Sequence, residues 1–110
     1  MIDIQTLGIE RFQATASDAA ALLRALSNEK RLMILCQLGD GELSVGELLP
    51  RVGLSQSALS QHLARLRDEG LVGTRREATT IFYRITDPSV LKVIAVLAEI
   101  FCPPLPAEKA

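Results

Sequence analysis

The chain has 110 residues, of which 12 are Lys or Arg and 13 are Asp or Glu, so its net charge is −1. Hydrophobic residues make up 48% and charged residues 23%, which indicates one globular domain and excludes a largely disordered chain. The sequence contains no run of about 18 apolar residues and begins with no basic, apolar signal-peptide pattern. We therefore expect no membrane partner and a cytoplasmic location.

The pattern of apolar residues divides the chain into three parts. Residues 1–16 show little pattern and are expected to form a flexible N-terminal arm. Residues 17–102 carry the periodic segments and are expected to form the folded domain, with residues 103–110 as a C-terminal tail. Within the domain, Ser17 is placed to cap a first helix that ends at Leu26.

A second helix and a helix-turn-helix pair are predicted next. Either Ser27 or Asn28 caps the second helix. Ser44 and Glu47 have the spacing of a capping box, which opens a short third helix. The fourth helix lies between residues 55 and 70 and carries leucines at helical spacing on one side. A short helix, a tight turn and a longer helix are the layout of a helix-turn-helix.

The fourth helix starts with compact, uncharged, hydrogen-bonding side chains. These are Ser55, Gln56, Ser57, Ser60 and Gln61. Such groups match the edges of bases in a DNA major groove, and a bidentate Gln–adenine contact gives about 1–3 kcal/mol of discrimination. An ordinary solvated helix surface more often carries Lys and Glu, although Ser55 also has a capping role. We predict that these five residues bind DNA.

Residues 72–85 alternate strand-forming residues with polar ones, which predicts a two-stranded hairpin whose tip is at residues 77–79. Arg75 and Arg76 lie on this hairpin. They are predicted to reach DNA phosphate or a narrow minor groove, or else they protect an exposed edge strand. Asp87 and Pro88 are placed to cap a last helix over residues 89–101, which is apolar on most sides. A domain this small cannot wrap it, so we expect a homodimer through the terminal helices.

Positive charge gathers on the expected DNA-binding part. Residues 55–84 contain five basic and three acidic side chains, whereas the segments before and after them are net negative. The excess is modest. Tight binding to DNA therefore needs two copies of the domain and well-placed polar contacts to phosphate.

The order of these elements resembles the ArsR/SmtB family of winged-helix repressors over most of the chain. Residues 26–32, 42–48, 54–72 and 80–84 carry the resemblance, and 54–72 is its most specific part. The resemblance implies a mainly α fold of five helices with a two-stranded β-wing. It also implies a dimeric repressor on a two-fold symmetric DNA operator, which leaves the DNA when an inducer binds and which is neither an enzyme nor dependent on a cofactor.

The metal ligands of many family members have no counterpart here. Ser44 and Gly46 stand where metal sensors have the two thiolates of a Cys-Val-Cys pattern. Residues 88–102 contain no His and a single carboxylate, Glu99, where other members bind zinc. We therefore expect no metal site, with a metal-responsive repressor that uses a non-standard site as the alternative.

The sequence around Cys36 and Cys102 resembles the persulfide- and redox-responsive branch of the family. The resemblance implies that reactive sulfur species or oxidants join the two cysteines through a disulfide or a polysulfide, and that DNA affinity then falls. Either cysteine is also compatible with a small buried apolar residue.

Two alternatives come from other classes of function. A thiol enzyme needs a group that activates its sulfur, but the only histidine, His62, lies on the expected DNA-reading helix, where we interpret it as a surface or boundary residue. A winged helix used only for contacts with other proteins is the second alternative, and it predicts no sequence-specific binding to DNA.

Overall fold

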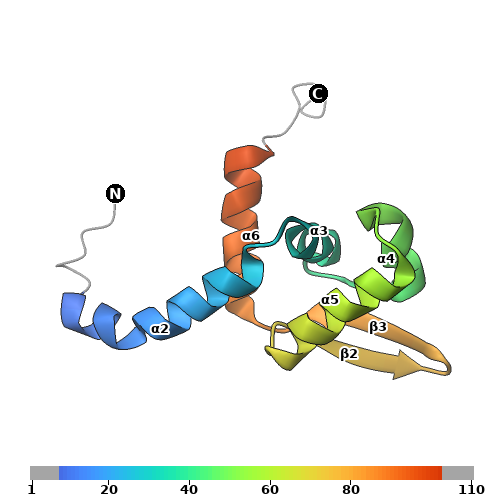
Figure 1. The fold of residues 1–110 in the computed structure, drawn as a ribbon, viewed down its shortest axis with the longest axis horizontal. Helices are drawn as coiled ribbons and strands as arrows, with labels where there is room; N and C mark the ends of the chain where they lie inside the picture. The colour runs from blue at the N-terminus through green and yellow to red at the C-terminus, as the bar shows by residue number, and fades with distance from the viewer. Residues whose placement is uncertain (1–7, 103–110) are drawn as a thin grey trace.

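The computed structural model describes residues 8–102 and is mainly α-helical (Figure 1). This part of the chain contains five helices and one three-stranded antiparallel sheet. In chain order the elements are α2 (Ile9–Leu26), α3 (Glu29–Leu38), β1 (Glu42–Ser44), α4 (Val45–Val52), α5 (Gln56–Asp68), β2 (Val72–Glu77), β3 (Thr80–Ile85) and α6 (Pro88–Phe101). The predicted fold class, a mainly α winged helix with five helices, is confirmed.

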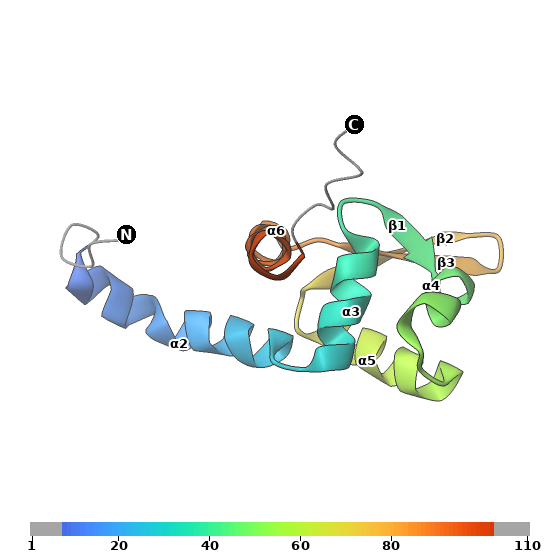
Figure 2. The same cartoon turned by 90° about the horizontal axis from the view of Figure 1, so that it is seen from above.

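Helix α2 begins at Ile9, so the predicted start at Ser17 is wrong and part of the expected arm is helical. Residues 9–16 contain no Gly or Pro and include several good helix formers, which explains their conformation. These residues carry a weak amphipathic pattern, because they lie in the part of α2 that packs against little else. The buried residues of α2 are its last two, Ala25 and Leu26. Figure 2 shows α2 reaching away from the other elements. Residues 1–7 of the expected arm and the expected tail, 103–110, lie outside the described residues.

Side-chain caps fix where α3 and α4 begin. The side-chain oxygen of Asn28 accepts hydrogen bonds from the backbone N–H groups of Lys30, at 2.9 Å, and Arg31, at 3.1 Å. Asn28 and not Ser27 is therefore the cap of α3. The capping box is present at the start of α4, where Glu47 N–H donates to Ser44 Oγ and Ser44 N–H donates to Glu47 Oε1.

The predicted hairpin is formed by β2 and β3, whose turn contains Ala78 at a positive φ of 56°. A third strand, β1, pairs with the other side of β3 and gives the sheet order β1-β3-β2. The sequence did not predict β1 because three residues are too few to show an alternating pattern. The added strand fixes the base of the hairpin next to α4.

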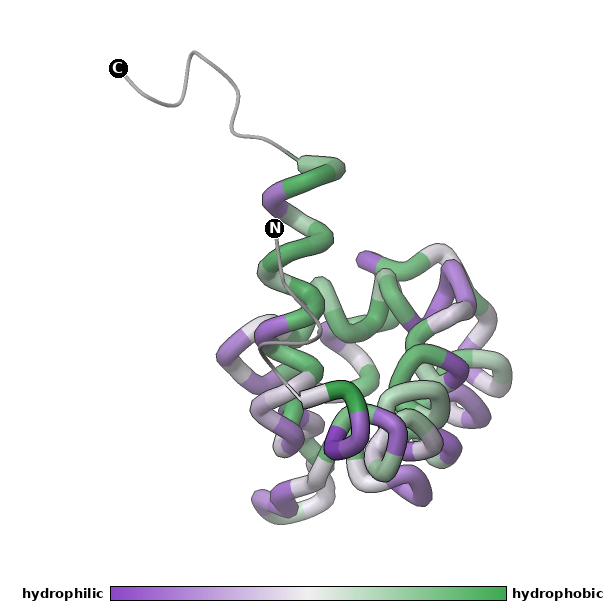
Figure 3. Tube along the Cα trace, turned by 90° about the vertical axis from the view of Figure 1, so that its left-hand side faces the viewer, coloured by the Kyte–Doolittle hydropathy of each residue, from purple (hydrophilic) through white to green (hydrophobic). Residues whose placement is uncertain are grey.

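Helix α6 starts as predicted. Asp87 Oδ1 accepts a hydrogen bond from Ser89 N–H at 2.8 Å, and Pro88 occupies the first helical turn. Figure 3 shows that α6 is hydrophobic along most of its length, yet only Val90 and Ile94 are buried within the chain. Much of its apolar surface is therefore without a partner in the single chain.

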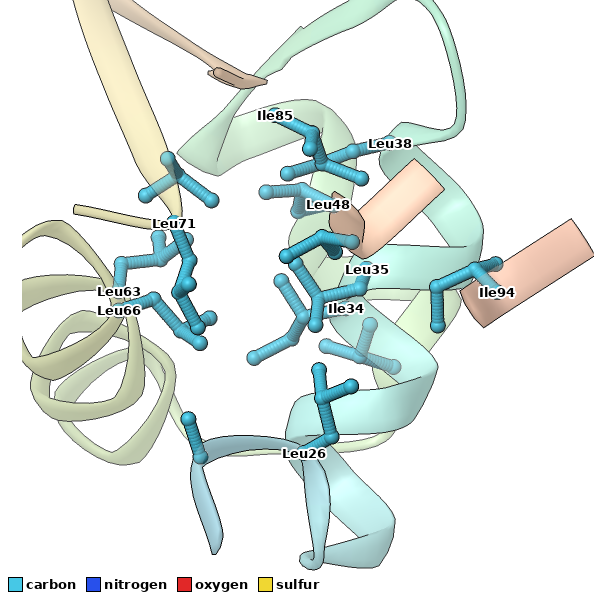
Figure 4. Close-up of a cluster of buried hydrophobic side chains, with 14 of the residues drawn as sticks. Leu26, Ile34, Leu35, Leu38, Leu48, Leu63, Leu66, Leu71, Ile85 and Ile94 are labelled. Atoms are coloured by element: carbon cyan, nitrogen blue, oxygen red, sulfur yellow. The ribbon is translucent and has the colours of Figure 1, made fainter. Parts of the chain in front are cut away.

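The core lies between α3, α4, α5 and the start of the hairpin, and the end of α2 and the first half of α6 also contribute to it (Figure 4). The three leucines predicted for the apolar side of α5, Leu59, Leu63 and Leu66, are fully buried. Ile34 and Leu35 of α3 are also fully buried in the same cluster. Burying a side chain of this size contributes about 1.5–3 kcal/mol. This packing sets which side of α5 faces solvent.

Candidate DNA-reading surface and dithiol pocket

The N-terminus of α5 is capped by Ser55, the residue that precedes the helix. Ser55 Oγ accepts a hydrogen bond from Ala58 N–H at 3.2 Å and lies 3.5 Å from Ser57 Oγ. One oxygen of the N-cap therefore satisfies a backbone donor that the helix itself leaves free. Ser55 is exposed, so its capping role and a contact with DNA phosphate are compatible.

All five residues predicted to read DNA from α5 are exposed. These residues are Ser55, Gln56, Ser57, Ser60 and Gln61. The buried leucines occupy the other side of the same helix, so packing into the core leaves this polar side facing outward. That these side chains contact DNA stays a prediction.

Arg75, predicted to contact DNA, has its guanidinium held by neighbours on the sheet. Its Nε donates to Glu42 Oε1 at 2.9 Å and its Nη1 donates to Glu77 Oε2 at 2.7 Å. The guanidinium also lies 4.6 Å from the ring centroid of Phe82. The hydrogen bond from Arg75 lowers the pKa of the Glu42 carboxyl below its ordinary value. These contacts favour a role in holding the wing together.

Arg76, the next residue along β2, is exposed. Among residues 8–102, the ion pairs of the wing involve Arg75 and none involves Arg76. The sequence alone does not distinguish the two arginines. It does not indicate the Arg75–Glu42 pair, because that pair depends on the unpredicted strand β1.

His62 is half-buried at the border between the polar and apolar sides of α5. Burial lowers the pKa of its imidazole, and the charges of Arg31 and Arg65 lower it further. The neutral form is therefore favoured. This position agrees with the interpretation of His62 as a boundary residue.

The two cysteines, far apart in the sequence, line the same pocket. Cys36 lies on α3 and Cys102 is the residue that ends α6. The pocket has a volume of about 180 Å³, and its other lining residues are Leu32, Leu97, Ala98 and Phe101. Both thiols are free and exposed. Burial, and to a smaller extent the charge of Cys102, raise the pKa of the Cys36 thiol.

Among residues 8–102, no group of three or more His, Cys, Asp or Glu side chains gathers in a way that holds a metal ion. None of the helices in the described part of the chain is long and apolar enough to cross a bilayer.

The winged-helix class of proteins is defined by a recognition helix packed against the core, a short helix before it and a β-hairpin beside them. Helix α5, helix α4 and the hairpin of β2 and β3 have this arrangement. Residues 28–74 match the family described as bacterial regulatory protein, arsR family. The transcriptional activator HlyU of Vibrio cholerae serotype O1 is 50% identical over 96 residues, which cover 87% of this chain and 89% of HlyU.

Solved structures agree with this similarity. Reduced HlyU from Vibrio cholerae N16961 has a TM-score of 0.80 and 52% identity, and the match covers 84% of this chain and 98% of that one. The transcriptional repressor BigR from Xylella fastidiosa has a TM-score of 0.81 and 43% identity, with 86% and 97% covered.

The chain belongs to the ArsR family of bacterial regulatory proteins, which confirms the resemblance seen in the sequence. It is a DNA-binding transcriptional regulator and not an enzyme.

Proposed function

We propose that this protein is a homodimeric repressor that leaves a two-fold symmetric operator when a disulfide or polysulfide joins Cys36 to Cys102. The observation that carries the proposal is the shared pocket: α3 and α6 bring two free thiols to one site. A covalent bridge across that site links the helix behind the recognition unit to the terminal helix. The protein acts in the cytoplasm, where bacterial operators are found.

The chemistry at the pocket requires an oxidant. When two thiols form a disulfide they lose two protons and two electrons. A hydropersulfide, RSSH, accepts them and leaves as the thiol RSH and H₂S. Hydrogen peroxide accepts them and leaves as two molecules of water. The thiolate is the attacking species, so the raised pKa of Cys36 slows any reaction that begins there at neutral pH.

The exposed apolar surface of α6 supports a homodimer. Val96, Ile100 and Phe101 are 53%, 62% and 73% exposed in the single chain. Large apolar side chains gathered on one helix typically mark a contact with another protein. A second copy of α6 has the matching apolar character, and a two-fold pair of recognition helices then matches a two-fold operator.

The bridge acts on DNA binding through the position of the dimer helix. Recognition helices of a dimer read two half-sites about 34 Å apart, one turn of DNA. Leu35 of α3 is fully buried in the cluster that also holds α5. Joining Cys102 to Cys36 therefore fixes the position of α6 relative to α3 and α5. In our proposal, the separation of the two recognition helices in this geometry no longer matches the separation of the two half-sites.

Binding to an operator tests the proposal. A DNA site is first selected from random duplexes with the reduced protein. Gel shifts then compare reduced and polysulfide-treated protein for the wild type, Cys36→Ser, Cys102→Ser and the double variant. Mass spectrometry reports the bridge. We expect treatment to release DNA from the wild type only. Release from the treated double variant would overturn the proposed switch.

The direction of regulation needs its own measurement, because the relatives include an activator, HlyU, and a repressor, BigR. In vitro transcription from a promoter that contains the selected site provides it. We expect the reduced protein to lower transcript yield and the bridged protein to restore it. A rise in transcript yield with the reduced protein would contradict repression.

A further inference from the structure

The dithiol pocket is apolar apart from its two sulfur atoms. Its lining consists of the thiols and of Leu32, Leu97, Ala98 and Phe101. None of the charged residues of α3 or α6 lines it. Its volume is about 180 Å³, and an apolar cavity of about 150 Å³ is large enough to bind benzene. The pocket therefore has room for a small apolar molecule beside the two thiols.

An apolar lining discriminates against charge. A carboxylate or ammonium group loses hydration when it enters such a pocket, and no side chain in the lining replaces that hydration. A propyl or similar group instead gains from covering Leu97 and Phe101. Burial raises the pKa of the Cys36 thiol, although both thiols keep exposed surface at the mouth of the pocket.

We propose that the pocket selects uncharged organic polysulfanes with small apolar substituents over anionic sulfur donors of equal reactivity. This inference rests on the proposed function, since it names the class of inducer for the same pair of cysteines.

The reaction balances with a trisulfide, RSSSR, as the oxidant. One cysteine thiolate attacks a terminal sulfur of the trisulfide, the S–S bond to that sulfur breaks, and the persulfide anion RSS⁻ leaves with its electron pair and then takes up a proton to give RSSH. The second cysteine then attacks the mixed disulfide and releases the thiol RSH. The two thiol protons end on RSSH and RSH, and the two cysteines are oxidised to a disulfide.

The test uses two trisulfides that differ in charge and share a chain of three carbons on each side. Dipropyl trisulfide is neutral, and the trisulfide of 3-mercaptopropionate carries two carboxylates. Mass spectrometry measures the rate at which each forms the Cys36–Cys102 bridge in the full, reduced protein. Each rate is divided by the rate at which the same trisulfide reacts with a small free thiol in solution. This ratio corrects for the intrinsic reactivity of the trisulfide. We expect a corrected preference of about tenfold or more for the neutral compound.

Two matched variants check that the pocket causes the preference. Ala98 lines the pocket, whereas Ala95 is exposed on the same helix outside the lining. Ala98→Lys places a positive charge in the lining, so it should speed the reaction of the dicarboxylate and reduce the preference several-fold. Ala95→Lys should leave the preference unchanged.

The outcomes separate this inference from the proposed function. If both trisulfides bridge the wild type at equal corrected rates and release DNA, the selectivity is wrong and the switch stands. If neither forms a bridge, the switch itself is wrong. Equal effects of Ala98→Lys and Ala95→Lys would contradict the role of the lining.

Discussion

Arg75 and Arg76 are neighbours in the sequence but have different surroundings. Both side chains are exposed, but Arg75 is ion-paired with Glu42 and Glu77, whereas none of the ion pairs among residues 8–102 involves Arg76. A basic side chain that binds phosphate displaces counterions, so removing it flattens the dependence of affinity on salt. An arginine that is already paired with carboxylates displaces few counterions when DNA binds. The two residues can therefore be told apart by salt dependence and not by affinity alone.

We expect Arg76→Ala to weaken operator binding several-fold and to reduce the slope of log affinity against log salt by about 1. Arg75→Ala should change that slope less, because its charge is balanced locally. Fluorescence anisotropy at several salt concentrations measures both. A larger loss of slope in Arg75→Ala than in Arg76→Ala would show that the wing rearranges on DNA and frees Arg75.

The thiol of Cys36 should react slowly at neutral pH. Burial raises its pKa, which lowers the fraction of thiolate at pH 7 relative to a free cysteine. In the Cys102→Ser variant the smaller contribution from Cys102 is removed and the burial remains. We expect the rate of alkylation of Cys36 by iodoacetamide to rise about tenfold per pH unit through pH 8 and to remain below that of free cysteine. A plateau near pH 7 would contradict this.

At the scale of single elements, Ser55 caps α5 and is also predicted to contact DNA, and one pair of substitutions separates these two roles. Its Oγ caps α5 by accepting from Ala58 N–H, and its exposed position lies next to the predicted DNA-reading residues. Aspartate is as good a cap as serine but brings negative charge toward phosphate. Alanine removes the cap without adding charge.

We therefore expect Ser55→Ala to lower the free energy of unfolding by about 1 kcal/mol. Ser55→Asp should keep that stability and lose most of its DNA affinity. Urea denaturation and gel shifts provide the two measurements. Normal operator binding by Ser55→Asp would place Ser55 away from the DNA backbone.

The helix boundaries that the sequence predicted well are those set by local chemistry. Asn28, Ser44 and Asp87 each accept hydrogen bonds from residues two or three positions later, so each cap is readable from a short stretch of sequence. The start of α2 was missed because residues 9–16 bury almost nothing and so leave no strong pattern.

In the candidate site, too, features set by local sequence could be predicted, whereas features set by long-range packing could not. One helix carries the predicted reading residues, so helical spacing alone was enough to place them on one side. The pocket around Cys36 and Cys102 depends on the packing of α3 against α6, and the pair of Arg75 with Glu42 depends on strand β1. Spacing in the sequence holds no information about either contact, and only the family resemblance indicated that the cysteines act together.

At the scale of the whole molecule, apolar surface is concentrated on the two helices at the ends of the described chain. Phe12 and Leu23 of α2 are 46% and 61% exposed, and α6 exposes apolar residues along its second half. Figure 1 shows most of α2 and the second half of α6 extending away from the group formed by α3, α4, α5 and the hairpin. The end of α2 and the first half of α6 contribute Leu26, Val90 and Ile94 to the core, whereas the rest of both helices carries the exposed apolar surface that needs a partner.

A charge placed on α6 should separate the two copies. Ile100 is 62% exposed and does not line the dithiol pocket. Burying an unpaired lysine in an apolar interface costs several kcal/mol, so we expect Ile100→Lys to be monomeric at micromolar concentration and to lose cooperative operator binding. Analytical ultracentrifugation and gel shifts measure the two effects. Ile81→Lys is the matched control, because Ile81 is an exposed apolar residue of the wing, away from α6. If the Ile100→Lys protein stays dimeric while its circular dichroism is unchanged, α6 is not the dimer helix, and the proposed bridge between Cys36 and Cys102 would have to act on DNA binding within a single chain.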